Sequence, residues 1–288
     1  MTPTPGPGKV EHYQKQLMLA RLAGDELAEG DALNNLGNAW AEAGQPRPAI
    51  ECFAQSLALA RALGNRLAEA PTLVNLGNAY LDVGEPRQAI ECYEQRLMIA
   101  RELGDRHGEG VTLGSLGVAH GALGDQRRAT DYHAQHLAIT RELGDQPWEA
   151  VALGNLAAAR ATLGETRQAI EGYQQQLALV RALGDRDGEG HTLGNLGHAH
   201  YTLGELPAAV GYYEQQAALA RRLGDRRAEA IGRWHASLTL DKLGDRAAAI
   251  AQAEAALPLF EQTGDPLADK VRQTLAAWQA EGGSQPAA

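Results

Sequence analysis

The amino-acid sequence predicts an all-α protein, a right-handed α-α superhelical solenoid of helix-turn-helix repeats. Two observations lead to this fold class. A glycine occupies residue 24 and every twentieth residue from there to residue 264, and the segment before each glycine carries apolar residues at helical spacing. The 20-residue segments alternate between two kinds, so that the true period of the chain is 40 residues.

The recurrent glycine predicts where each helix ends. The residue just past a helix often takes the left-handed conformation, which glycine adopts without steric cost. We therefore expect one helix in each 20-residue unit. Segments of the first kind, helix A, are 33–44, 73–84, 113–124, 153–164 and 193–204, and segments of the second kind, helix B, include 48–65, 88–105 and 168–185.

Each A helix is expected to pack against the B helix that follows it. Neither kind of helix can bury its apolar stripe alone, so each hairpin must also stack on the next one. Glycine and alanine on the facing sides allow two helix axes to approach closely, and aromatic residues fill the remaining space. The pattern thus favours a repeat array over a single thick core.

Five residues of the first hairpin recur forty residues later. Leu36, Gly37, Trp40, Ala49 and Phe53 become Leu76, Gly77, Tyr80, Ala89 and Tyr93. This pattern resembles the signature of tetratricopeptide repeats, and the 40-residue unit is similar to the long subclass found in Partner-of-Inscuteable adaptors, kinesin light chains and bacterial regulators. The resemblance covers six repeats, 26–65, 66–105, 106–145, 146–185, 186–225 and 226–265. It implies a protein that binds peptides.

Both ends of the chain follow the same period. Residues 9–25 align with a B helix that has no A helix of its own, and residues 266–281 fall in the A register as a C-terminal capping helix. The remaining ends, 1–8 and 282–288, are rich in Pro, Gly, Ser and Ala, and we expect them to be disordered.

The bulk composition excludes several classes of partner. A formal net charge of -10 and only four lysines argue against a nucleic-acid partner, because a phosphate backbone would be repelled. No segment has the roughly 18 consecutive apolar residues of a membrane span. The start lacks a signal peptide and the chain has two cysteines, so a cytoplasmic location is expected. Cys52 and Cys92 are equivalent positions of neighbouring B helices and are predicted to be packing residues.

The candidate binding residues lie on the A helices, on the side away from the buried stripe. The resemblance implies that A helices line the concave groove, where residues at i, i+4, i+7 and i+11 share a face. In related solenoids the Asn of this stretch holds the backbone of the ligand, and Asn suits this role because it offers both a donor and an acceptor. The alternative is that Asn merely tolerates a solvated face. The candidates are Asp31, Asn35, Asn38, Glu42, Asn75, Asn78, Asp82, Ser115, Asn155, His191, Asn195, His198 and His235.

Charge differs along this predicted groove. Its N-terminal half is acidic through Asp31, Glu42 and Asp82, whereas the other end offers histidines together with Arg233 and Lys242. The groove therefore favours a ligand with basic residues facing the first two repeats. These charges would mainly set the register of the ligand and its association rate. The alternative is that local charges of an acidic protein mean little.

Histidines raise a further hypothesis in the third repeat. His120, His133 and His136 could converge on a metal, or they could replace aromatic residues in half-buried slots, which is the preferred interpretation. His198 and His235 offer a similar alternative for metal, pH-sensing or catalytic roles. No residue set predicts a cofactor, and no nucleophile with a partner predicts an enzyme. Arg160 occupies an aromatic slot without explanation.

The sequence therefore predicts a scaffold or adaptor whose groove binds a peptide or helical segment of a partner protein. The alternative is a regulatory sensor of a small signalling peptide, and a metal-binding or enzymatic protein is a third. The apolar face of the first helix lacks an A helix of its own repeat, although the A helix of the first repeat is expected to cover part of it. The rest could be covered by the Pro-rich start of the chain or by a second copy, which would make a homodimer. That face consists of Val10, Tyr13, Leu17 and Ala20.

Overall fold

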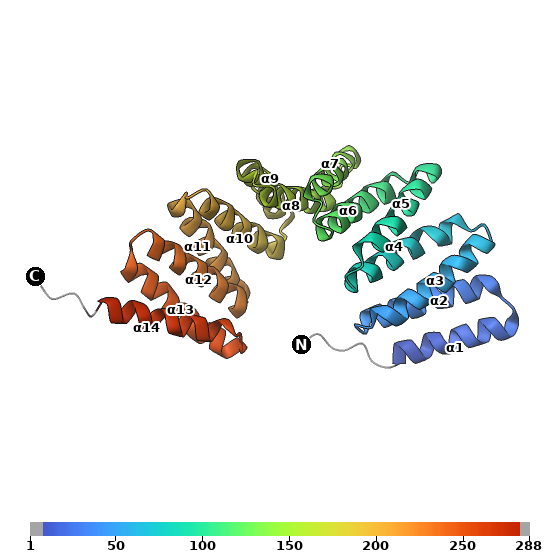
Figure 1. Cartoon of the computed structure of the whole chain (residues 1–288), viewed down its shortest axis with the longest axis horizontal. Helices are drawn as coiled ribbons and strands as arrows, with labels where there is room; N and C mark the ends of the chain where they lie inside the picture. Colours follow the sequence, from blue (N-terminus) through green and yellow to red (C-terminus); the bar gives the residue numbers. More distant parts are fainter. Residues whose placement is uncertain (1–7, 283–288) are drawn as a thin grey trace, which may run out of the picture. The chain divides into compact units, whose positions relative to one another are not determined.

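The computed structural model describes residues 8–282, which form fourteen α-helices and no strand (Figure 1). The disordered ends that the sequence predicts lie outside this range, apart from Gly8 and Gly282. The helices are α1 Gly8–Ala23, α2 Glu26–Glu42, α3 Pro46–Ala62, α4 Arg66–Asp82, α5 Pro86–Leu103, α6 Arg106–Ala122, α7 Gln126–Leu143, α8 Gln146–Thr162, α9 Thr166–Leu183, α10 Arg186–Thr202, α11 Leu206–Leu223, α12 Arg226–Lys242, α13 Arg246–Thr263 and α14 Leu267–Gly282.

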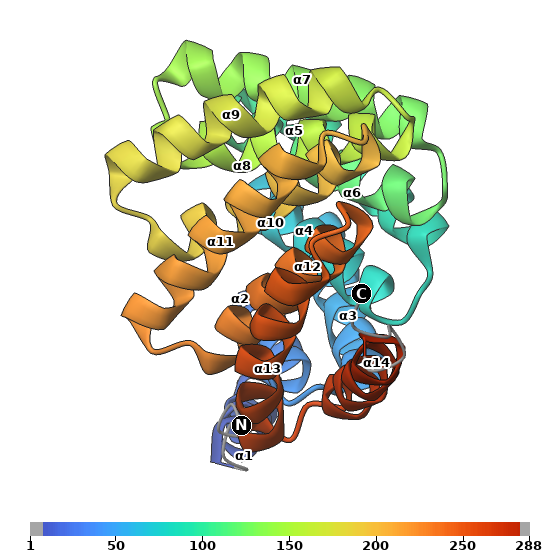
Figure 2. The same ribbon diagram turned by 90° about the vertical axis from the view of Figure 1, so that its left-hand side faces the viewer.

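The chain divides into two compact units. The first, Met1–Asp145, holds α1 to α7, and the second, Gln146–Ala288, holds α8 to α14. Within each unit every helix packs against the next, and Figure 2 shows α11, α12 and α13 side by side. The predicted all-α solenoid of hairpin repeats is confirmed in this arrangement.

Glycine and aspartate set the helix boundaries. In residues 8–282 every residue with positive φ is a glycine of the 20-residue series, from Gly24 to Gly264, with φ between 64° and 87°. After several of these stops an aspartate caps the next helix: the Asp105 carboxylate accepts from the Gly108 backbone N–H at 2.8 Å, and Asp185 accepts from Gly188 at 2.9 Å. Such caps satisfy donors that a helix start leaves unpaired.

Glycines of the A helices admit aromatic rings of the B helices. A Cβ atom added to Gly77 would lie 2.5 Å from the ring of Tyr93, and the same holds for Gly37 and Phe53. Both rings are at most 1% exposed. The predicted close approach of A and B helices is therefore present, and each ring closes the gap that its glycine leaves.

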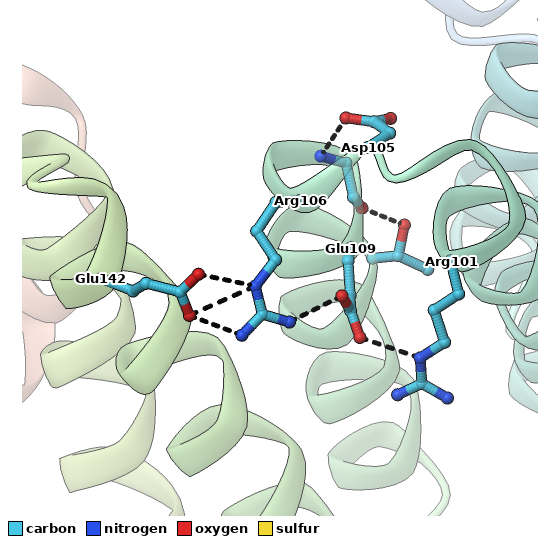
Figure 3. A network of polar contacts seen from close by, with 7 residues as sticks. Arg101, Asp105, Arg106, Glu109 and Glu142 are labelled. Atoms are coloured by element: carbon cyan, nitrogen blue, oxygen red, sulfur yellow. Dashed lines mark hydrogen bonds and ion pairs between the residues drawn. The ribbon is translucent and has the colours of Figure 1, made fainter.

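An ion-pair network that we did not predict links consecutive helices. In Figure 3, Arg106 of α6 donates to Glu142 of α7 at 2.6 Å and to Glu109 of its own helix at 2.7 Å. Arg101 of α5 donates to the other oxygen of Glu109 at 2.8 Å. These contacts tie one B helix to the next hairpin. The same arrangement recurs around Glu69, with Arg61 and Arg66, and around Glu189, with Arg181 and Arg186.

The first helix uses its predicted apolar face to pack on α2. Leu17 and Ala20 are buried, and Val10 and Tyr13 join the same cluster with Leu33 and Leu36 of α2. α2 therefore covers part of this face, and Val10 and Tyr13 stay half-buried. Homodimerisation through α1 remains a prediction. The exposed apolar residues of α1 are Met18, Leu19 and Leu22.

The last helix packs on α13 with a face displaced from the A register. Val271, Leu275 and Trp278 are buried against α12 and α13, whereas the A register would place them at the positions of Asp31, Asn35 and Asn38. α14 begins at Leu267, whose backbone N–H donates to the carboxylate of Asp265 at 3.0 Å.

The two cysteines lie in hydrophobic clusters. Cys52 packs near Leu17 and Leu36, and Cys92 packs near Phe53. Burial raises the pKa of both thiols, that of Cys92 to about 11. Both are free cysteines, in keeping with the predicted packing role.

Candidate functional site

Each unit presents a row of accessible side chains along its A helices, which we call the A face. In α2 it consists of Asp31, Asn35, Asn38 and Glu42, all exposed or half-buried, while the intervening Leu33 and Leu36 are buried. The A face continues at equivalent positions 40 residues apart. In the first unit these are Asn75, Asn78, Asp82 and Ser115, and in the second Asn155, His191, Asn195, His198 and His235, each exposed or half-buried.

Four of the asparagines keep their amide groups available. Among the described residues, the side chains of Asn35, Asn38, Asn155 and Asn195 make no hydrogen bond. An amide in this state can both donate to and accept from a ligand backbone. Ser115 differs, because its hydroxyl donates to the carbonyl of Val111 in its own helix at 3.2 Å.

The other two asparagines are engaged within the protein. Asn75 donates to the side-chain oxygen of Asn34 at 3.2 Å, so Asn34 belongs to the same surface although the sequence did not single it out. Asn78 accepts a hydrogen bond of 2.6 Å from the hydroxyl of Tyr93. Asn78 is exposed, yet its side-chain oxygen is engaged, because the hydroxyl of the buried Tyr93 reaches it.

Replacing Asn78 by Ala is expected to lower the free energy of unfolding by about 1–3 kcal/mol, because the hydroxyl of the fully buried Tyr93 loses its acceptor. Asn38→Ala is the matched control, since the aromatic residue at the equivalent place is Phe53, which has no hydroxyl. Urea denaturation of both variants measures the difference. Equal stability of the two would mean that the tyrosine hydroxyl finds another acceptor.

The charges of the A face are partly neutralised. Glu42 forms a 2.8 Å ion pair with Lys9 of α1, while Asp31 and Asp82 remain exposed without a pair among residues 8–282. The ammonium of Lys242 lies 4.4 Å from the centroid of the Tyr201 ring. Arg233 does not belong to this face, because its guanidinium turns to Gln252 of α13. The acidic character of the A face in the first unit thus depends on the carboxylates of Asp31 and Asp82.

The histidines of the third repeat occupy aromatic slots. His120 stacks on Tyr132 with ring centroids 5.2 Å apart, and His133 fills the space beside Gly117. Burial lowers the pKa of His133 to about 4 and also lowers those of His120 and His136. Among residues 8–282 no group of three or more His, Cys, Asp or Glu side chains could hold a metal ion. The arrangement therefore fits packing.

Three histidines of the second unit lie on the A face, as the sequence indicates: His191, His198 and His235. The ring of His235 contacts that of Tyr213, with centroids 5.1 Å apart. Surrounding protein atoms, and to a lesser degree the nearby His198, lower the pKa of His235. A neutral imidazole at this place can accept as well as donate a hydrogen bond.

The half-buried Arg160 has an unpaired Nε atom. Nothing in the structure explains why an arginine occupies this aromatic slot.

Small pockets open beside the A face at equivalent places in both units. In the first unit a pocket of about 70 Å³ adjoins Asp31 and Gly30, with Leu59 and Leu63 of α3 in its wall. In the second unit a pocket of the same volume adjoins His191. Its lining includes the equivalent residues Gly190, Leu219 and Leu223. Sequence reasoning missed these pockets, although the missing side chains of Gly30 and Gly190 signal them.

None of the helices in residues 8–282 is long and apolar enough to cross a membrane.

No curated protein matches the sequence. Similar solved structures include a signal-transduction ATPase with numerous domains from Pyrococcus horikoshii that carries a tetratricopeptide-repeat sensor. It has a TM-score of 0.79 and 18% identity over 96% of this chain, which spans 41% of that protein's length.

Two further solved structures are similar in fold. Aspartyl phosphate phosphatase F from Bacillus subtilis has a TM-score of 0.68 and 14% identity, covering 94% of this chain and 74% of its own. A Rap protein complexed with competence and sporulation factor has a TM-score of 0.58 and 14% identity, covering 96% and 87%. At such identities these similarities show the fold alone. A family model described as tetratricopeptide repeat matches residues 29–102, 68–142 and 148–222, and the chain therefore belongs to the tetratricopeptide-repeat family.

Proposed function

We propose that the protein is a non-enzymatic binding module whose A face holds an extended or helical segment of a partner protein. The observation that carries this proposal is the set of exposed or half-buried, unpaired asparagine amides at equivalent places of three A helices, α2, α8 and α10. Asn35 and Asn38 in the first unit and Asn155 and Asn195 in the second offer both donors and acceptors. Amide groups at such positions suit a peptide backbone, whatever side chains the ligand carries.

The pockets beside the A face support an anchor for aliphatic side chains. The pocket at Gly30 combines the apolar wall of Leu59 and Leu63 with the accessible carboxylate of Asp31. A segment with an aliphatic residue next to a basic one fits this combination. The second unit places His191 where Asp31 lies in the first, so we expect a basic residue to be preferred only in the first unit.

A regulatory sensor of a small signalling peptide is the second candidate. It is favoured by the fold similarity to the Rap protein complexed with competence and sporulation factor and to the ATPase with a repeat sensor. A sensor should change its radius in X-ray scattering when a short peptide binds, whereas a scaffold should keep its radius. Under either candidate the protein acts inside the cell, and its net charge of -10 disfavours nucleic acid.

The test uses a peptide selected from a random displayed library against the purified chain, followed by calorimetry. Replacing Asn35 and Asn38 together by Ala should weaken binding by about 1–3 kcal/mol, since each lost hydrogen bond costs about 0.5–1.5 kcal/mol. Gly30→Ala is the second variant. Its methyl group would enter the pocket 3.9 Å from the Cβ of Leu59, so it should weaken binding without harming the fold.

The control is Glu51→Ala at an exposed position of the B helix α3. It should bind like the wild-type chain. If both A-face variants bind as tightly as this control while remaining folded, the peptide binds elsewhere and the proposal fails. If only Gly30→Ala binds normally, the amides hold the ligand and the pocket does not contribute.

A further inference from the structure

The largest pocket described in the second unit lies between α11, α12 and α13 rather than on the A face. It measures about 830 Å³. Three arginines, one glutamine, one glutamate and two alanines line it: Arg221, Arg222, Arg233, Gln252, Glu214, Ala217 and Ala218. None of these residues belongs to the surface proposed to bind a peptide, so this pocket concerns a second ligand.

Two residues that line this pocket depart from the repeat. Ala217 stands where the six other B helices carry a leucine, at Leu17, Leu57, Leu97, Leu137, Leu177 and Leu257. Arg233 stands where five other A helices carry a leucine, at Leu33, Leu73, Leu113, Leu153 and Leu193. The equivalent pocket of the first unit keeps both leucines, Leu97 and Leu113, and measures about 370 Å³. The larger pocket thus lacks both apolar side chains that the smaller one has on the seam.

Arg233 also changes the pairing of its neighbours. It donates to the carboxylate of Glu229 at 2.8 and 2.9 Å and to the amide oxygen of Gln252 at 3.2 Å. In other repeats this glutamate binds the arginine in the last turn of the preceding B helix, as Arg181 binds Glu189 at 2.8 Å. Arg233 thus binds the Glu229 carboxylate, which would pair with Arg221 if this repeat followed the others.

The second usual partner of Arg221 is also missing. Arg21, Arg61 and Arg181 each donate to a glutamine of the next B helix, at Gln55, Gln95 and Gln215. The equivalent residue in α13 is Ala255. As a result, Arg221 and its neighbour Arg222 are exposed and make no hydrogen bond or ion pair within the described part of the chain. Two unpaired guanidinium groups thus line one pocket.

The chemistry of these groups selects the ligand. Guanidinium groups bind oxyanions through paired N–H donors, and phosphate matches this geometry. The positive charge of Arg233 is offset by Glu229. The pocket lining therefore keeps two positive charges, from Arg221 and Arg222, and one negative charge, from Glu214. A phosphate monoester carries about -1.5 to -2 charges at pH 7, more than a single carboxylate. We propose that this pocket binds a phosphate monoester, with Ala217 and Ala218 against its organic part.

The experiment measures binding of inorganic phosphate, O-phosphoserine and succinate to the full chain by calorimetry at low salt. We expect O-phosphoserine to bind more tightly than inorganic phosphate, since its organic part fills the pocket, and succinate to bind at least tenfold more weakly than either. Arg221→Gln together with Arg222→Gln should weaken phosphate binding at least tenfold. Arg167→Gln, at an exposed position of α9 in the same unit, controls for overall charge and should bind normally.

A second variant closes the pocket by restoring the repeat. Ala217→Leu with Arg233→Leu returns both seam leucines and frees Glu229 for Arg221, so we expect a folded chain that no longer binds O-phosphoserine. Dichroism and thermal melting report the fold. The proposal is overturned if the wild-type chain does not bind phosphate, if succinate binds as tightly, or if the double Gln variant binds unchanged. Peptide binding to the A face should persist in every variant, so the two proposals fail separately.

Discussion

Leu76→Ala is expected to lower the free energy of unfolding by about 2–5 kcal/mol, the usual cost of emptying a buried leucine site. Leu76 of α4 is 5% exposed and lies in one cluster with Phe53, Leu73 and Cys92. The surrounding rings and backbone are held by neighbouring hairpins and can refill the space only in part. Each removed atom therefore costs both its transfer free energy and its packing contacts.

The measurement is urea denaturation followed by far-ultraviolet dichroism. Met98→Ala is the control, because Met98 of α5 is 61% exposed and its truncation leaves no cavity. We expect the control to change stability by less than about 0.5 kcal/mol. A similarly small change in Leu76→Ala would mean that the buried stripe of α4 has been placed on the wrong side of the helix.

His133 is expected to make the first unit lose stability in acid. Burial lowers its pKa in the folded chain to about 4, from 6.5 in the unfolded chain. Between these values the unfolded state binds more protons, so stability is complete above pH 6.5 and falls as the pH drops toward 4. At about 1.4 kcal/mol per pKa unit the full loss is about 3 kcal/mol. The neighbouring His136 and His120, whose pKa values are also lowered, act in the same direction.

His133→Phe tests this origin of the acid sensitivity. Phe53 already packs against a glycine at the equivalent place in the first repeat, so the ring is compatible with the fold. Stability measured from pH 7 to pH 4 should fall less steeply in this variant, by up to about 3 kcal/mol over the range. His12→Gln, at an exposed position of α1, is the control and should follow the wild-type curve. Parallel curves for all three chains would contradict the assignment, since carboxylates contribute equally to each.

The helices and their ends were predictable because they follow from local chemistry. The left-handed glycine, the capping aspartate and the apolar spacing each act within a few residues, so Gly104, Asp105 and the helix after them could be placed without knowing the fold. The A/B seam was predictable for a related reason. A repeat of 40 residues places the same glycine and ring together each time, as with Gly37 and Phe53 or Gly77 and Tyr93.

The pairing of polar side chains was decided by the tertiary structure. Asn38 and Asn78 are equivalent in sequence, yet only Asn78 is engaged, because a tyrosine hydroxyl from the next helix reaches it. Glu229 likewise binds Arg233 of its own helix rather than the arginine that the repeat provides.

By itself the sequence determined the helical period, the glycine stops and the side of the A helices α2 to α12 that stays accessible, since these depend on backbone conformation and on hydrophobic spacing. Only the tertiary structure decided which amides remain free and where a pocket lined by Arg221 and Arg222 opens. The physical reason is that a polar contact between side chains of different helices is made or lost over a few tenths of an ångström. The lining of a pocket likewise depends on how neighbouring helices pack around a small residue such as Ala217.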